Sequence, residues 1–222
     1  MISFSCTIRT LPAVDPSALP QVPLEAGIGP DNPPCPACGE PLFGWVAAPG
    51  PSAPPVRRCE ACGLGVVGEE ASTEEALLAL FALPRAGDAL LFENRASLQA
   101  WIGARVWAAL APGSRFLFTP EAVRRLAAER DETPRRARWR AGAGIAGMWQ
   151  TLLNVATFGR NAGLGWLGIA QAEPARAAWQ RRLDALITAV LALPVLAVAV
   201  PLEASAAVFG RGGTLSLRLR PP

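Results

Sequence analysis

Four cysteines in two close pairs constrain the fold of this chain more than any other feature. The spacing C-x2-C-x20-C-x2-C is formed by Cys35, Cys38, Cys59 and Cys62. A tight turn lets both thiolates of a pair reach one ion, and Gly39 and Gly63 allow the two turns to close. Four thiolates around a tetrahedral centre favour Zn²⁺ and leave no position open for substrate or water. The pattern therefore predicts a structural zinc ribbon over residues 35–67, with two knuckles joined by a β-hairpin arm.

The composition excludes one common kind of catalysis. The 222 residues contain no His and no Tyr, and every basic residue is Arg. Acid–base catalysis by His and metal binding by His are therefore excluded. The formal charge of +3 is too small to indicate nucleic acid by itself. Paired cysteines and a start that does not read as a signal peptide lead us to expect a cytoplasmic protein.

The residues before the first cysteine pair are predicted to be an N-terminal arm or linker, residues 1–34. The stretch "ISFSCTIRT" alternates in the manner of one strand, and Cys6 within it is interpreted as an ordinary strand cysteine. The prolines that follow remove backbone donors and disfavour helix.

After the ribbon, short strands alternate with helices. A helix capped by Ser72 or Thr73 is predicted over 69–83, and the apolar run "DALLFEN" indicates a buried strand. "ASLQAWIGARVWAAL" is predicted to be a helix, or a helix and a loop. A short strand then leads into the clearest helix start of the chain, with Thr119 as cap and Pro120 at the first helical position.

The last third of the chain is predicted to be mostly helical. "RRARWR" indicates a strand at a solvent-exposed edge, and helices are predicted over 147–161 and 175–193. Near the end, Leu215, Leu217 and Leu219 alternate with polar residues behind a glycine turn, which predicts a half-buried terminal strand of a sheet.

The ribbon together with "GDALLFENRASLQAWIGARVWAALAPGSRFLFTPEAVRRLAAERD" resembles the bacterial class I S-adenosylmethionine-dependent methyltransferases that carry an N-terminal zinc ribbon. In that family the fifth core strand ends in Pro-Asn, a "SLQA" helix and a Trp-containing loop follow, and an aromatic strand leads into "TPE-x-L-x-x-L". The matching residues are Asn94, Ser97 to Ala100, Trp107, Phe116 to Phe118 and Thr119 to Glu121. Glu93 stands where the family has Pro. The resemblance covers residues 35–67 and 74–220, including the "GRGGTLSL" strand.

The resemblance implies an α+β or partial α/β fold. The zinc ribbon would be followed, over residues 68–222, by half of a Rossmann-like methyltransferase sheet with hydrophobic C-terminal helices. The family builds its cofactor site on the first half of the sheet, with an acidic-Gly-x-Gly-x-Gly loop after strand one. Only about 25 residues separate Cys62 from the first matching strand, too few for four βα units. The chain therefore resembles a truncated member that lacks the cofactor-binding half.

Gly142, Gly144 and Gly147 spell G-x-G-x-x-G, a weak signal for an S-adenosylmethionine or dinucleotide loop. The preceding "RRARWR" is charged where a phosphate-loop strand is apolar, and the next acidic residues lie outside the expected spacing. A turn that lets the following helix pack closely is the favoured interpretation. Glu93 and Asn94, at the end of the predicted strand, are weak candidates for cofactor contact, with capping of the strand as the favoured interpretation.

Residues 185–202, "ALITAVLALPVLAVAVPL", are apolar and just reach the length of a membrane span. A buried helix pair broken at Pro194 is the favoured interpretation. Docking to a membrane surface and a true span are the alternatives.

Three functions fit these observations. The favoured one is a zinc-binding, non-catalytic methyltransferase-like protein that acts through a protein partner, or through a second copy, covering the open sheet edge. The second is a methyltransferase whose cofactor site is rebuilt around the glycines or completed by a partner. The third is a nucleic-acid binder that uses the ribbon and an arginine run with an aromatic residue in it. That run consists of Arg135, Arg136, Arg138, Trp139 and Arg140.

Overall fold

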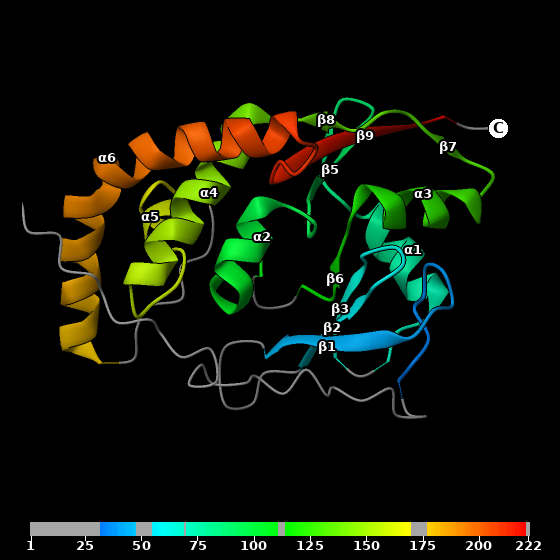
Figure 1. Cartoon of the computed structure of the whole chain (residues 1–222), viewed down its shortest axis with the longest axis horizontal. Helices are drawn as coiled ribbons and strands as arrows, with labels where there is room; N and C mark the ends of the chain where they lie inside the picture. The colour runs from blue at the N-terminus through cyan, green and yellow to red at the C-terminus, as the bar shows by residue number, and fades with distance from the viewer. Residues whose placement is uncertain (1–31, 48–54, 69, 111–113, 170–176, 221–222) are drawn as a thin grey trace, which may run out of the picture. The chain divides into compact units, whose positions relative to one another are not determined.

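The computed structural model describes residues 32–47, 55–68, 70–110, 114–169 and 177–220. Residues Asn32–Pro222 form one compact unit (Figure 1). The predicted arm strand and Cys6 lie outside the described residues.

The ribbon forms the first of two sheets. Its strands, in spatial order, are β1 (Leu42–Ala47), β2 (Pro55–Cys59), β3 (Gly65–Val67) and β6 (Phe116–Leu117). The antiparallel pairing of β1 with β2 confirms the predicted hairpin. The fourth strand comes from beyond the ribbon, since Val66 pairs with Phe116 and Gly65 with Leu117. A later part of the chain thus completes the ribbon's sheet.

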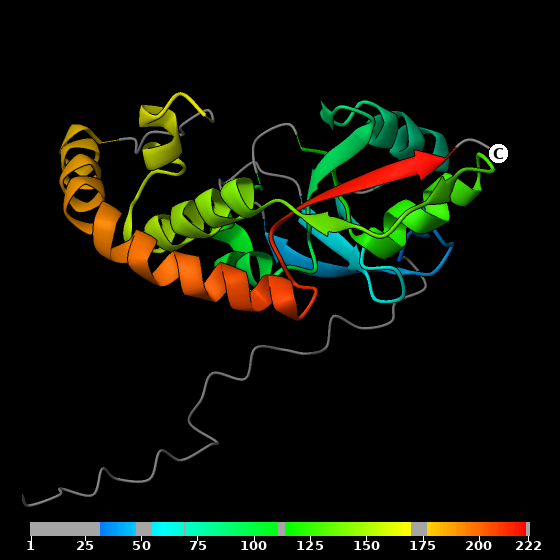
Figure 2. The same cartoon turned by 90° about the horizontal axis from the view of Figure 1, so that it is seen from above.

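The second sheet is built around the C-terminal strand. It comprises β4 (Arg85–Ala86), β5 (Ala89–Glu93), β9 (Thr214–Arg220) and β7 (Thr133–Pro134) in that order, and β8 (Arg138–Trp139) also pairs with β9. The expectation of a terminal position for the last strand is wrong, because β9 has partners on both sides (Figure 2). Alternation along a strand identifies its buried face but carries no information on its place in the sheet.

Every strand pair among the described residues is antiparallel. The predicted α+β class is confirmed, whereas the Rossmann-like half sheet stays a prediction. Because β5 and β8 each run antiparallel to β9, they run parallel to each other.

The predicted helix starts are confirmed where local capping determines them. Helix α1 (Thr73–Phe81) begins with a capping box, in which Ser72 and Glu75 satisfy each other's backbone N–H groups. Helix α2 (Leu98–Gly103) continues into a 3₁₀ turn at Ala104–Val106. Helix α3 (Pro120–Ala128) has Thr119 as its cap, whose hydroxyl accepts from the N–H of Ala122.

Two predictions for the C-terminal helices are wrong. Helix α4 (Ala141–Ala156) begins at Ala141 rather than at Gly147, so the three glycines lie inside a helix instead of forming a turn. Glycine disfavours helix by only about 1 kcal/mol per residue, which close packing at Gly144 and Gly147 offsets.

After the short α5 (Ala162–Trp166), helix α6 (Ala178–Val208) runs through Pro194 without the predicted break. It bends instead (Figure 1), because a proline removes one helical hydrogen bond and displaces the preceding turn.

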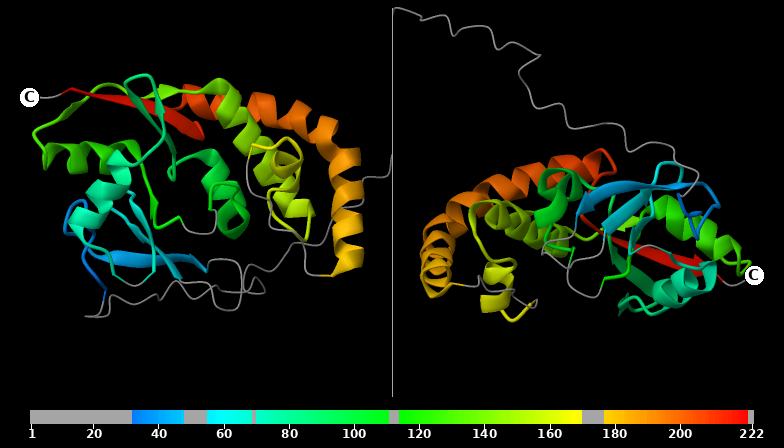
Figure 3. Two further views of the ribbon diagram at one scale, coloured as in Figure 1. Left: turned by 180° about the vertical axis from the view of Figure 1, so that it is seen from behind. Right: turned by 90° about the horizontal axis from the view of Figure 1, so that it is seen from below.

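One hydrophobic core joins the ribbon to the rest of the unit. Its members include Cys35, Leu42 and Leu64 from the ribbon, and Leu80, Phe92, Leu126 and Leu217 from α1, β5, α3 and β9. Helices α4 and α5 both contact α6 outside this core (Figure 3). The ribbon therefore packs as part of the unit.

Candidate functional site

The four cysteines converge on one point. Their Sγ atoms all lie within 4.8 Å of one another. The Sγ atoms of Cys35 and Cys62 are 3.6 Å apart, and those of Cys38 and Cys59 are 3.4 Å apart. Four sulfurs bound to one zinc at about 2.3 Å lie about 3.8 Å from each other. The cluster could therefore hold a metal ion with small adjustments of the side chains.

The two knuckles have matching backbone geometry. Gly39 and Gly63 have φ angles of 77° and 76°, in the left-handed region that glycine adopts without strain. Backbone N–H groups of Ala37 and Cys62 point at the sulfurs of Cys35 and Cys59, each at 3.5 Å. These turns confirm the role predicted for the two glycines.

Two of the four thiols have a raised pKa. Burial raises the pKa of Cys38 to about 11. The pKa of Cys62 is raised too, first by its hydrogen bond with Cys35 and then by burial. A bound cation would reverse this preference by stabilising the thiolates, so we expect metal binding to release protons.

Two side chains from outside the ribbon hold its second knuckle. The hydroxyl of Thr119 donates to the carbonyl of Cys62, and Nε of Arg95 donates to the carbonyl of Gly63. The Arg95 guanidinium also lies over the ring of Trp45, 4.9 Å from its centroid. A metal ion in this cluster would therefore tie β1 and β2 to the start of α3.

At two glycines of α4, polar side chains of the protein lie in the space that a Cβ atom would need. A Cβ at Gly144 would lie 2.6 Å from both Glu203 Oε1 and Trp139 Nε1, and one at Gly147 would lie 2.7 Å from Gln99 Oε1. Gly142 differs, because a Cβ there meets open space. It lines a cavity of about 350 Å³ with Trp139 and Thr214 among others.

Glu203, on α6, is the centre of a buried polar cluster. Its Oε1 accepts from the N–H of Gly213 at 2.6 Å and from Nε1 of Trp139 at 3.0 Å. Its Oε2 accepts from Nε2 of Gln99 at 2.9 Å, and the same nitrogen donates to the carbonyl of Gly144 at 2.7 Å. The sequence prediction missed this cluster. The available signal was a carboxylate at the end of an apolar helix, where burial requires partners.

Glu93 and Asn94 have separate roles. The carboxylate of Glu93 accepts from the hydroxyl of Thr214 at 3.0 and 2.9 Å, and burial, aided by the nearby charge of Glu203, raises its pKa to about 7. Asn94 is buried, donates to the carbonyl of Gly212 at 3.0 Å and accepts from the N–H of Ala96 at 3.0 Å. Asn94 thus caps the end of β5. Glu93 reaches the cavity beside Gly142 only through Thr214.

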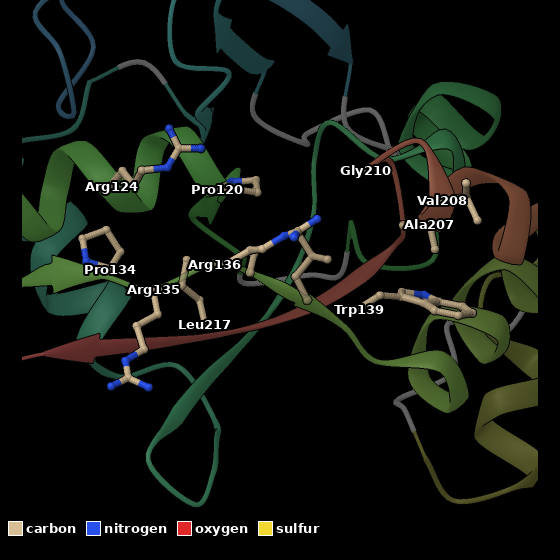
Figure 4. Close-up of a pocket in the computed structure, with 13 residues that line it drawn as sticks. Pro120, Arg124, Pro134, Arg135, Arg136, Trp139, Ala207, Val208, Gly210 and Leu217 are labelled. Carbon is tan, nitrogen blue, oxygen red and sulfur yellow. The ribbon is translucent and has the colours of Figure 1, made fainter.

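The arginine run faces two cavities, because Arg140 lines the cavity beside Gly142 while two other members of the run line a second one. Arg135 and Arg136 line a cavity of about 450 Å³ together with Arg124 and Trp139. In Figure 4, Arg136 points across the cavity while Arg135 points away from it. Arg124 is ion-paired with Glu121. These arginines therefore do not converge on one anion.

Among the described residues, α6 is the one helix long and apolar enough to cross a membrane by length and composition. Only 11% of its most apolar window is buried, so the favoured prediction of a buried helix pair over 185–202 is wrong in its burial as well as in its break.

No protein-family model matches the chain, and comparisons with curated proteins and with solved structures give no significant match.

Proposed function

We propose that this chain is a zinc-binding, non-catalytic, methyltransferase-like protein that acts in the cytoplasm by presenting a binding surface. The four converging thiols support zinc as the ion, because an all-sulfur tetrahedral set suits Zn²⁺. Such a set occupies every coordination position. The metal would then stabilise the fold and take no part in a reaction.

The non-catalytic part of the proposal rests on one observation. Side chains of the protein itself fill the space beside Gly144 and Gly147. A cofactor loop uses glycine so that a ligand can approach the backbone. Here the carboxylate of Glu203 and the amide of Gln99 lie against Gly144 and Gly147. At these two glycines the protein's own side chains take the room that a cofactor would need.

We also propose that the second sheet is a remnant of a larger methyltransferase sheet. The support is the sequence resemblance over residues 74–220, which include β5 and β9. Within the described chain, β8 pairs only with β9 and leaves its other edge open. An open edge and an exposed apolar helix are surfaces that a second chain or another partner can cover.

Titration calorimetry of the zinc-loaded protein with S-adenosylhomocysteine tests the proposal. We expect no saturable heat at millimolar ligand. Saturable micromolar binding would overturn it in favour of a methyltransferase with a rebuilt site. A Gly142→Leu variant, which narrows the cavity beside Thr214, would then show whether that cavity holds the ligand.

A further inference from the structure

Helix α6 has its polarity inverted relative to a helix on the surface of a water-soluble protein. Its buried positions are Asp184, Thr188, Ala199, Glu203 and Ala206. Its exposed large side chains are Trp179, Leu183, Leu186, Val190, Leu193, Leu196, Val198, Val200 and Val208. The helix therefore turns its carboxylates inward and its leucines and valines outward. A surface helix in water has the opposite arrangement.

The inward carboxylates are fully engaged with the protein. Asp184 accepts from the N–H groups of Phe158 and Gly159, both at 2.8 Å, and Glu203 accepts the three hydrogen bonds described above. Between them, residues 185–202 contain no charged side chain. Helices in lipid follow this rule, in which ionisable groups face the protein and apolar groups face the hydrocarbon.

The start of α6 carries residue types that are typical of a membrane–water boundary. The exposed rings of Trp179 and Phe158 contact each other edge to face, with centroids 5.5 Å apart, and Trp166 on α5 is also exposed. Arg181 and Arg182 follow Trp179 in the first turns. Tryptophan favours the headgroup level of a bilayer, and arginine is attracted to anionic headgroups.

We infer that the exposed face of α6 docks into the surface of a lipid bilayer, with the leucines and valines among the acyl chains and the first turns near anionic headgroups. The inference rests on the proposed function, since it names the partner of a surface that the non-catalytic protein presents. The helix lies along the membrane rather than across it. Asp184 and Glu203 hold the two ends of the apolar segment against the rest of the protein, at points up to about 28 Å apart along the helix. If α6 crossed the bilayer, the protein attached at both points would be drawn into the hydrocarbon.

Vesicle flotation with the full, zinc-loaded chain tests this inference. The vesicles are phosphatidylcholine alone and phosphatidylcholine mixed with phosphatidylglycerol. We expect binding to the mixed vesicles that weakens as salt is raised. Leu193→Glu, on the exposed face, should lower the partition coefficient about tenfold or more, since one buried leucine is lost to the bilayer. The matched control is Leu78→Glu, because Leu78 on α1 is exposed to a similar degree, 63% against 77% for Leu193.

Flotation of the wild type and of Leu78→Glu, with loss in Leu193→Glu, supports the inference. No flotation of the folded wild type overturns it, as does equal loss in both variants. A dimer that Leu193→Glu dissociates, without any vesicle binding, also overturns it and assigns the face to a second copy. Binding of S-adenosylhomocysteine by a protein that still floats would refute the proposed non-catalytic function and leave the membrane face standing.

Discussion

The carboxylate of Glu203 accepts a 2.6 Å hydrogen bond from the backbone N–H of Gly213, which joins α6 to the residue before β9. Gln99 lies so close to Gly213 that no Cβ fits there. The same carboxylate holds the indole of Trp139 at the end of β8. One buried side chain on α6 thus positions two neighbouring strands of the second sheet.

Replacing this carboxylate should be costly. Glu203→Ala leaves the buried N–H of Gly213, the half-buried indole N–H of Trp139 and one amide N–H of Gln99 without this acceptor. We expect it to lower the free energy of unfolding by about 3 kcal/mol or more. Glu203→Gln keeps one oxygen and should cost clearly less. Chemical denaturation of both variants measures the difference. Equal costs would contradict the hydrogen-bonding account.

The glycines of α4 should respond differently to alanine. Gly142→Ala meets open space and should stabilise the helix by up to about 1 kcal/mol. Gly144→Ala places a methyl group against Glu203 and Trp139, and we expect a loss of about 1–3 kcal/mol. Thermal unfolding of the two variants and the wild type measures these changes in stability. A neutral Gly144→Ala would show that the cluster has room for a methyl group and is not closely packed.

Removal of the proposed zinc should unfold more than the ribbon. Cys62→Ser, or a strong chelator, should lower the melting temperature by about 10 °C or more, because the cluster shares its core with α1, α3 and β9. Cys6→Ser serves as the control and should keep both the metal and the melting temperature. An unchanged melting temperature after metal removal would contradict this prediction, because the shared core would then be stable without the metal.

The raised pKa of Glu93 predicts a pH dependence of stability. Its pKa is about 7 in the folded chain against 4.5 in the unfolded chain, so between these values the folded state holds the proton more strongly. The Glu93 contribution to stability therefore falls as pH rises from 4.5 to about 7 and is constant above that.

Glu93→Gln removes this dependence. As pH rises from 4.5 to about 7, the unfolding free energy of the wild type should fall relative to that of the variant. The fall should be at most about 1.4 kcal/mol per pH unit. Denaturation at pH 5, 6, 7 and 8 measures it. A difference that does not change with pH would contradict the shift.

The features predicted from sequence are those fixed by neighbouring residues. Ser72 with Glu75, Thr119 with Pro120, and the cysteine knuckles each carry their geometry within a few positions. The features that the sequence did not predict depend on contacts between residues that lie far apart in the chain. Helix α4 extends over its glycines because Glu203 and Gln99 come to lie against them. Pro194 bends α6 without ending it, because packing along the buried face continues on both sides.

Zinc K-edge X-ray absorption of the purified protein tests most directly the claim that the metal centre is closed and structural. We predict one zinc per chain with four sulfur neighbours at about 2.3 Å and no lighter atom in the coordination shell. A zinc with an oxygen or nitrogen neighbour, or a cluster that binds no zinc when folded, would contradict it.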